Sequence, residues 1–339
     1  MKKLNIDPVK IIKISLGAVT AAALGYALEL QYAVSAGIIC LLTIQDTRKE
    51  TLKITVKRLI AFCGVTALCT VIFGFFGFGF LQLGAVLGLF LIFCGALDMS
   101  EAIAMNSVIA THYFASGDVS PAMIGNELAL LAAGAGIGVM LNIFMPSNTR
   151  KIRLIQQETD EKIKRIIGRM AIYIAAEDKS DYTGSCFEET DRLLDALKRE
   201  SVKYIGNSFV SEKDYFYKYV GMRMEQCIIL MRIFTDIKRL NAVTSFAEPI
   251  AGFLKKMSDE FSEINDAVSL LEDLDGLFSY YSEESLPKSR EEFENRALLY
   301  HILCDLKNFV ALKAEFAKNL DEKEKSRYWL TDSTEKSAD

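Results

Sequence analysis

The sequence predicts an all-α protein: a polytopic membrane domain of about six transmembrane helices, followed by a cytoplasmic antiparallel helical bundle. Three observations predict this fold class. Residues 59–149 contain no lysine or arginine, and their acidic residues are limited to Asp98, Glu101, Asp118 and Glu127. Apolar stretches long enough to cross a bilayer fill the first half of the chain. Beyond residue 150, charged and apolar residues alternate at the spacing of amphipathic helices.

Residues 1–146 form the predicted transmembrane domain, and charged or turn residues divide it into six candidate spans. A spanning helix needs about 20 apolar residues, so the second and fifth candidates are short. We expect the second to continue as an amphipathic helix through Asp46 to Lys57, as suits a segment that lines a cavity. The predicted spans are residues 9–29, 31–45, 55–75, 79–97, 101–116 and 121–145.

Basic residues predict the orientation of these spans. They cluster in the N-terminal tail, between Arg48 and Arg58, and between Arg150 and Arg153, whereas the loops at the opposite ends of the spans have none. Because cytoplasmic loops retain lysine and arginine, both termini are predicted to be cytoplasmic and the protein to be a multi-pass cell-membrane protein in contact with lipid. Small residues recur every fourth position, as in closely packed membrane helices: Gly17, Ala21 and Gly25, then Gly84 and Gly88, then Gly134 and Gly138.

Residues 147–320 are predicted to form a bundle of four or five helices. Ser147, Asn148 and Thr149 offer capping side chains before the first of them. We expect residues 321–339 to be a charged tail that frays. The expected helices cover residues 149–174, 185–205, 212–241, 246–280 and 289–320.

Several function classes are disfavoured by what the sequence lacks. The chain has no phosphate-binding glycine loop, no zinc-ligand spacing and no nucleophile paired with a base, so we expect no enzyme activity, no cofactor and no metal. The formal net charge of the chain is −5, and the excess of acidic over basic residues lies in the second half. An acidic soluble domain argues against nucleic-acid binding, which requires basic side chains to replace counterions on phosphate.

Four sets of residues carry a resemblance to a known family. They are residues 24–26 with 32–33, residues 45–53, Arg58 with Gly64, and residues 126–128 leading through Gly134 and Gly138 to Pro146. These segments resemble the aromatic acid exporter family and, more distantly, the fusaric acid resistance efflux proteins. The resemblance spans the membrane half, and the second half is similar to that family's C-terminal domain. It implies six spans per chain, a cytoplasmic helical domain, efflux of small aromatic carboxylates and assembly as a homo-oligomer.

Ionisable groups at membrane depth suggest where chemistry occurs, because burying a charge there is costly. Glu127, inside the sixth span, and His112, in the fifth, are the candidates for proton coupling, since an imidazole and a carboxyl can exchange protons near neutral pH. Two structural alternatives remain open. His112 can serve only to hydrogen-bond a neighbouring helix, and Glu127 can cap its helix in the headgroup layer.

Cations and aromatic rings supply candidates for substrate binding. Arg48, Lys49 and Arg58 lie near the inner mouth, and a guanidinium pairs well with a carboxylate. Topology alone would also place these cations there. Tyrosines can stack on an aromatic ring, although near interfaces they usually act as anchors; the candidates are Tyr26, Tyr32 and Tyr113.

Two functions from different classes follow. The first is a membrane transporter that exports small aromatic carboxylic acids or related organic anions, driven by the proton gradient. The second is a membrane-anchored regulatory or interaction protein whose cytoplasmic bundle binds a partner. A cavity lined by Arg48, Arg58, Glu127 or His112 would favour the first, and a closed apolar bundle would favour the second.

Overall fold

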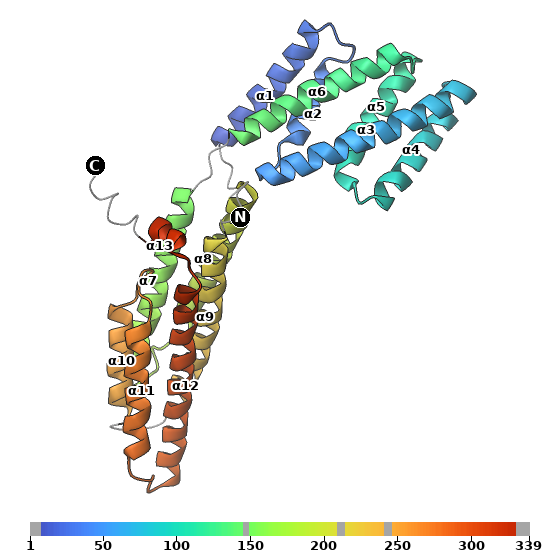
Figure 1. Ribbon diagram of the computed structural model, residues 1–339. Coiled ribbons are helices and arrows are strands. Elements are labelled where there is room, and N and C mark those ends of the chain that lie inside the picture. The colour runs from blue at the N-terminus through green and yellow to red at the C-terminus, as the bar shows by residue number, and fades with distance from the viewer. Residues whose placement is uncertain (1–7, 145–148, 209–213, 241–245, 330–339) are drawn as a thin grey trace. The chain divides into compact units, whose positions relative to one another are not determined.

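The computed structural model describes residues 8–144, 149–208, 214–240 and 246–329, and every regular element among them is an α-helix. The chain divides into two compact units (Figure 1). The N-terminal unit comprises Met1–Ser147 with Gly206–Phe209, and the C-terminal unit comprises Asn148–Ile205 with Val210–Asp339. Each unit has its own buried apolar core.

Six helices build the N-terminal unit in two groups. In one group α1, α2 and α6 pack on one another, and in the other α3, α4 and α5 do so, while α3 also contacts α6 and α2 (Figure 1). The bounds fall within a few residues of most of the predicted spans. The helices are α1 (Pro8–Ala27), α2 (Val34–Thr43), α3 (Arg48–Phe76), α4 (Phe80–Ala96), α5 (Ser100–Ser116) and α6 (Pro121–Ile143).

Among the described helices, α3 and α6 are long and apolar enough to cross a bilayer, and α1 from Ile11, α2 and α4 are shorter apolar helices. Only 28% and 33% of the residues in the most apolar parts of α3 and α6 are buried within the chain. A soluble core helix would be mostly covered by protein, so these two apolar helices need another apolar environment. Two helices therefore meet the criterion for spanning, where six spans were expected.

The expectation that the second span continues as an amphipathic helix through Asp46 to Lys57 is wrong. The backbone of Ile44 is extended, and the chain re-enters a helix only after Thr47, whose side chain accepts a hydrogen bond from the amide of Glu50. This N-cap satisfies one of the free amides of a new helix. The charged segment is therefore the first part of α3, which runs without a break for 29 residues.

Glycines allow the close approach of α6 to α2. A Cβ added at Gly134 would lie 2.5 Å from the carbonyl oxygen of Ala36, and one at Gly138 would lie 3.2 Å from that of Cys40. The predicted small-residue packing thus holds for the sixth helix. On α4, by contrast, an added Cβ at Gly84 or Gly88 would meet no atom within 4 Å, so these two glycines make no such contact within the chain.

The C-terminal unit is an elongated helical bundle with a larger core. Its helices run side by side (Figure 1), with α9 packed on α7 and α12, and α10 on α7 and α11. Tyr215, Phe216 and Tyr219 of α9 are buried in that core. The helices are α7 (Thr149–Tyr173), α8 (Ser185–Gly206), α9 (Tyr215–Arg239), α10 (Ala247–Asp259), α11 (Val268–Glu283), α12 (Arg290–Lys318) and α13 (Glu322–Tyr328).

Two expectations for this unit are corrected. The predicted helix 246–280 is two helices, because Asn265 and Asp266 accept the amides of Ala267 and Val268 in successive turns and Ala267 adopts a φ of +65°. Short polar side chains compete with helical hydrogen bonding in this way. The tail is also ordered at its start, since a capping box around Asp321 begins α13. Residues 330–339 and the predicted caps Ser147 and Asn148 lie outside the described residues.

Candidate functional site

Glu127 and His112 form a buried acid–base pair that joins α6 to α5. His112 Nδ1 lies 3.0 Å from Glu127 Oε2, and the two side chains are 10% and 1% exposed, respectively. Ser120 is the N-cap of α6, accepting from the amide of Met123. Glu127 therefore does not cap its helix, and the two residues chosen separately from the sequence are brought together.

Side chains from the turn before α2, from the first turn of α2 and from α6 complete this group, which we call the Glu127 cluster (Glu127, His112, Tyr32, Ser35 and Asn126). The Tyr32 ring stacks on the His112 ring at 4.0 Å between centroids and 6° between planes. His112 Nε2 lies 3.3 Å from the hydroxyl of Ser35. The Asn126 amide donates to Glu127 Oε1 at 3.3 Å. Both imidazole nitrogens and both carboxylate oxygens therefore have partners.

The turn that presents Tyr32 is held in an uncommon conformation. Tyr32 has a φ of +59°, a left-handed value that bulky side chains rarely adopt. Asn126 of α6 holds this turn through two hydrogen bonds with the backbone of Gln31. The amide of Gln31 donates to Asn126 Oδ1 at 2.7 Å, and Asn126 Nδ2 donates to the Gln31 carbonyl at 3.1 Å. The strain is thus offset by contacts that place the ring on His112, as is common at functional sites.

Arg58 lies in a second buried polar group, which we call the Arg58 cluster (Arg58, Thr43, Leu42 and Asn106). Its guanidinium donates to the Thr43 hydroxyl at 2.9 Å and to the Leu42 carbonyl at 2.8 Å. The side chain of Asn106 donates to the backbone carbonyl of Arg58 at 3.4 Å. Within the described residues, Arg58 Nε and Asn106 Oδ1 are buried without a hydrogen-bond partner. Such groups are rare in proteins because they lose solvation without compensation.

The remaining predicted site residues lie apart from these clusters. Arg48, half-buried, and Lys49, exposed, occupy the first turn of α3. Tyr26 on α1 is 68% exposed. Tyr113 is fully buried, with its hydroxyl 3.2 Å from that of Thr66. Of the three tyrosines, only Tyr32 therefore contacts the Glu127 cluster.

The two clusters occupy different levels of the N-terminal unit. On α5, Asn106 and His112 are six positions apart, which corresponds to about 9 Å at 1.5 Å per residue. On α2, Ser35 and Thr43 are separated by about 12 Å on the same basis. Beyond the Arg58 level, Asn142 near the end of α6 donates to the hydroxyl of Thr51 and the carbonyl of Gln45. Polar groups thus recur along the interior at contacts that join α2, α3, α5 and α6.

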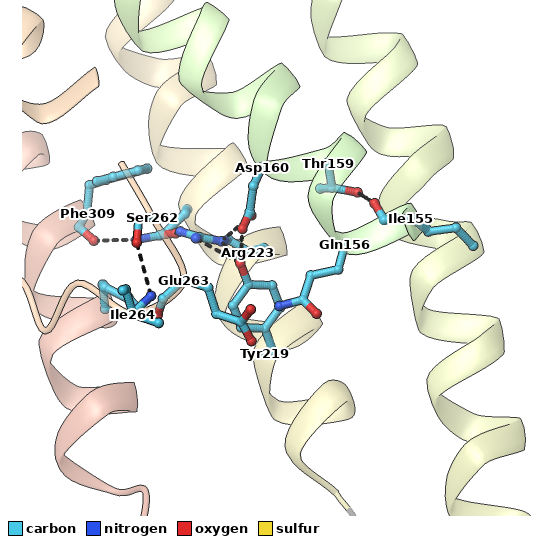
Figure 2. Close-up of polar contacts among 12 residues, drawn as sticks. Ile155, Gln156, Thr159, Asp160, Tyr219, Arg223, Ser262, Glu263, Ile264 and Phe309 are labelled. Atoms are coloured by element: carbon cyan, nitrogen blue, oxygen red, sulfur yellow. Dashed lines mark hydrogen bonds and ion pairs between the residues drawn. The ribbon is translucent and has the colours of Figure 1, made fainter. Parts of the chain in front are cut away.

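The C-terminal unit buries a different polar group around Arg223, shown in Figure 2. Arg223, only 1% exposed, lies with its Nε 3.0 Å from Asp160 Oδ1. It also donates to the Tyr219 hydroxyl and, at 2.7 Å, to Gln226. Tyr219 donates in turn to Asp160, and Gln226 donates to the carbonyl of Phe309. These contacts connect α7, α9 and α12.

Lys313 of α12 is buried beside this group. Burial, reinforced by repulsion from Arg223, lowers the pKa of Lys313 to about 7. Its ammonium donates to the backbone carbonyl of Glu263, and it lies 5.1 Å from the Trp329 ring. Arg223, Gln226 and Lys313 border a cavity of about 20 Å³, enough for roughly one water molecule. This group is therefore too tightly packed to hold an organic ligand.

Neither of the two cavities described for this chain is lined by Arg48, Arg58, Glu127 or His112; both lie in the C-terminal unit. The interior of the N-terminal unit is nevertheless not purely apolar, because it contains the Glu127 and Arg58 clusters. This interior is therefore not the closed apolar bundle set out above.

Comparison with known proteins covers nearly the whole chain. Residues 7–145 match the family described as "Aromatic acid exporter family member 1", and residues 149–314 match the "Putative aromatic acid exporter C-terminal domain". The "Uncharacterized protein YqjA" of Bacillus subtilis (strain 168) is 29% identical over 305 residues, which cover 90% of this chain and 94% of that protein. A solved structure of a "putative membrane protein from Clostridium difficile 630" is 26% identical, with a TM-score of 0.43, and covers 50% of this chain and 99% of its own.

Proposed function

The chain belongs to the aromatic acid exporter family and is therefore a membrane protein; from this premise we propose that it exports small aromatic carboxylates or related organic anions in exchange for protons. The observation that supports proton coupling is the Glu127 cluster. Its carboxyl and imidazole are buried, lie 3.0 Å apart and come from two different helices. Intramembrane ionisable pairs of this kind are typical of proton relays.

The charge of the pair depends on how many protons it holds. With one proton, shared between Glu127 and His112, the pair is neutral; with two it carries one positive charge, and with none it carries one negative charge. A neutral pair is the least costly state in a low-dielectric interior. Exchange requires that the pair gain a proton while the site is open to the outside and lose it while the site is open to the inside, where the organic anion then binds, so that proton and anion occupy the site in turn.

Arg58 is the strongest candidate for the substrate carboxylate. Its guanidinium is buried, and its Nε–H has no acceptor within the described residues. A carboxylate is the natural acceptor for such a group. Arg48 and Lys49, at the start of the same helix, would attract anions towards it, and Tyr32 offers an aromatic face next to His112.

The topology that fits this proposal has six spans with both termini in the cytoplasm. The basic residues support it, since they cluster before α1, at the start of α3 and after α6. The C-terminal unit then lies in the cytoplasm. Assembly of two or more copies belongs to the same proposal, and the exposed apolar surfaces of α3 and α4 are consistent with contacts to lipid or to another copy.

Uptake of radiolabelled 4-hydroxybenzoate into inverted membrane vesicles tests the proposal. We expect accumulation that depends on an imposed proton gradient and that the Glu127→Gln variant abolishes, because an amide cannot gain and lose the proton. The matched control is Glu101→Gln at the start of α5, where the carboxylate is 47% exposed and pairs with Lys57; its transport should be unchanged. Gradient-dependent uptake that persists in correctly inserted Glu127→Gln protein would refute proton coupling at this pair.

The alternative, a membrane-anchored interaction protein, predicts a different result. Vesicles would then accumulate no aromatic acid with or without a gradient, and Glu127→Gln would have no effect on transport. The buried polar interior of the N-terminal unit favours transport, since an anchor needs only apolar packing and each buried ionisable group would lower its stability.

A further inference from the structure

A second cavity lies in the C-terminal unit, between the end of α11 and the start of α12. Its volume is about 300 Å³, at the small end of the range of ligand pockets, about 300–1,000 Å³. Most of its wall is apolar, and four aromatic side chains contribute to it. The aromatic residues are Phe246, Tyr281, Phe293 and Tyr300. This size and lining suit a molecule with one or two rings.

Arg296 is the one basic side chain that lines this cavity. Its guanidinium lies 3.8 Å from the centroid of the Phe246 ring, and it donates to the carbonyl of Ser285 and to Glu292. Its Nε is buried and has no hydrogen-bond acceptor within the described residues. The Phe246 face and the Ser285 carbonyl fix the orientation of the planar guanidinium, so its remaining N–H groups, Nε–H among them, are presented in defined directions.

The acidic groups near the cavity already have partners. Glu292 is paired with Arg296 and also accepts the amide of Lys288 at 2.8 Å. Glu284, which lines the cavity, is hydrogen-bonded by the Tyr280 hydroxyl. The charge of Glu292 is thus paired with the guanidinium and Glu284 accepts a hydrogen bond from a neutral hydroxyl, whereas the guanidinium keeps unused donors. A ligand acceptor can therefore bind Arg296 without displacing its partners.

We infer that this cavity binds a small aromatic carboxylate, with the ring among the aromatic side chains and the carboxylate accepting from Arg296. Aromatic walls favour a planar ring over an aliphatic one, since ring pairs attract through their quadrupoles. A guanidinium that is already oriented loses little entropy on binding a carboxylate. The ligand would belong to the same chemical class as the exported substrate.

A regulatory role follows from this match and rests on the proposed function. If the chain exports aromatic acids, the occupancy of a site for them on the C-terminal unit would rise with their concentration and would regulate transport. The ligand would contact the loop after α11 and the first turns of α12, and so would add contacts between two helices that already pack on each other. Binding to the cavity itself does not depend on transport.

Equilibrium dialysis of radiolabelled benzoate against the detergent-solubilised full-length protein tests the site. We expect saturable binding that Arg296→Gln weakens by at least about tenfold, through loss of a charge-assisted hydrogen bond. The matched control is Arg290→Gln on the same helix, since Arg290 also pairs with a glutamate four residues away but is exposed; the affinity of this variant for benzoate should be unchanged. Ala297→Trp, at the exposed wall of the cavity, should block binding while leaving the thermal unfolding of the protein unaltered.

Competing ligands and a transport variant separate the possible outcomes. Cyclohexanecarboxylate and benzyl alcohol should compete more weakly than benzoate, since each lacks one of the two recognised features. Benzoate binding retained in Glu127→Gln but lost in Arg296→Gln supports the cavity, whatever the result of the vesicle experiment. Equal binding of benzoate by Arg296→Gln and by the wild type would overturn the inference. Stronger competition by benzylamine than by unlabelled benzoate would also overturn it, because it would mean that Glu284 selects a cation.

Discussion

Glu127 with His112 in the N-terminal unit, and Asp160 with Arg223 in the C-terminal unit, are both buried acid–base pairs at 3.0 Å. They differ in the base. A guanidinium stays charged at every physiological pH, and Arg223 is further bound by Tyr219 and Gln226. An imidazole can be neutral or cationic, and the proton exchange proposed above for Glu127 and His112 would use this property. Similar geometry therefore gives a fixed connection between helices in the C-terminal unit and, under the proposed function, a pair that exchanges protons in the N-terminal unit.

The largest expected effect tests the pair formed by Asp160 and Arg223. Arg223→Met should lower the free energy of unfolding of the C-terminal unit by about 3–5 kcal/mol, because it leaves the carboxylate of Asp160 buried without its charged partner. Thermal and urea unfolding of the full-length protein followed by circular dichroism measures the loss. Arg192→Met should have little effect, since Arg192 and Glu188 are about 80% exposed.

A double variant sharpens this test. Adding Asp160→Asn to Arg223→Met removes the unpaired charge and should restore part of the lost stability. No recovery would mean that Arg223 stabilises the bundle through packing against Phe261, from whose ring centroid its guanidinium carbon lies 4.3 Å, rather than by pairing with Asp160.

The second prediction concerns Lys313, which is buried beside Asp160 and Arg223 and can lose its charge. Its pKa is lowered from 10.5 to about 7 by burial and by Arg223. Above about pH 7 the unfolded chain therefore binds a proton at Lys313 that the folded chain does not. The free energy of unfolding then rises with pH, by up to about 1.4 kcal/mol per pH unit. The rise ends near pH 10.5, where the unfolded lysine also loses its proton. Below about pH 7 both states are charged and this contribution is constant.

Lys313→Met should remove that dependence. Urea unfolding at several pH values between about 7 and 9 should give a smaller slope of stability against pH than in wild type, and higher stability at the acid end of the range. Lys307→Met on the same helix is the control, because its ammonium is 48% exposed and pairs with Asp275. An unchanged slope in Lys313→Met would show that this lysine is solvated in the folded protein.

Helix positions in the N-terminal unit could be predicted because apolar runs end at charged or turn residues. The contact between Glu127 and His112 could not, since it depends on the rotation of α5 relative to α6. Arg58 was expected near the inner mouth, and the structure adds that it lies at a buried position of α3, next to Asn106, an amide on the buried face of α5. Uncharged polar residues inside predicted spans are therefore a signal that the sequence did contain.

The C-terminal unit was less predictable in its details. Arg223 was missed, although it follows Tyr215 and Tyr219 at intervals of four residues and so lies on the same buried face of α9. The break before Ala267 depended on hydrogen bonds that the side chains of Asn265 and Asp266 accept. In the sequence these two residues resemble ordinary polar residues of an amphipathic helix. The cavity at Arg296 required the loop after α11 to fold back, which no periodicity predicts.

The smallest expected effect tests how the pair formed by Glu127 and His112 is positioned. Gly134→Ala would place a Cβ 2.5 Å from the carbonyl of Ala36, so α2 must move away from α6, and with it Ser35, the neighbour of His112. Overpacking of this kind costs about 1–3 kcal/mol, and we expect a lower unfolding temperature together with a shifted pH optimum for efflux. Gly136→Ala on the same helix meets no atom within 4 Å and should leave both unchanged. A lower unfolding temperature with an unaltered pH optimum would mean that Ser35 does not tune the pair.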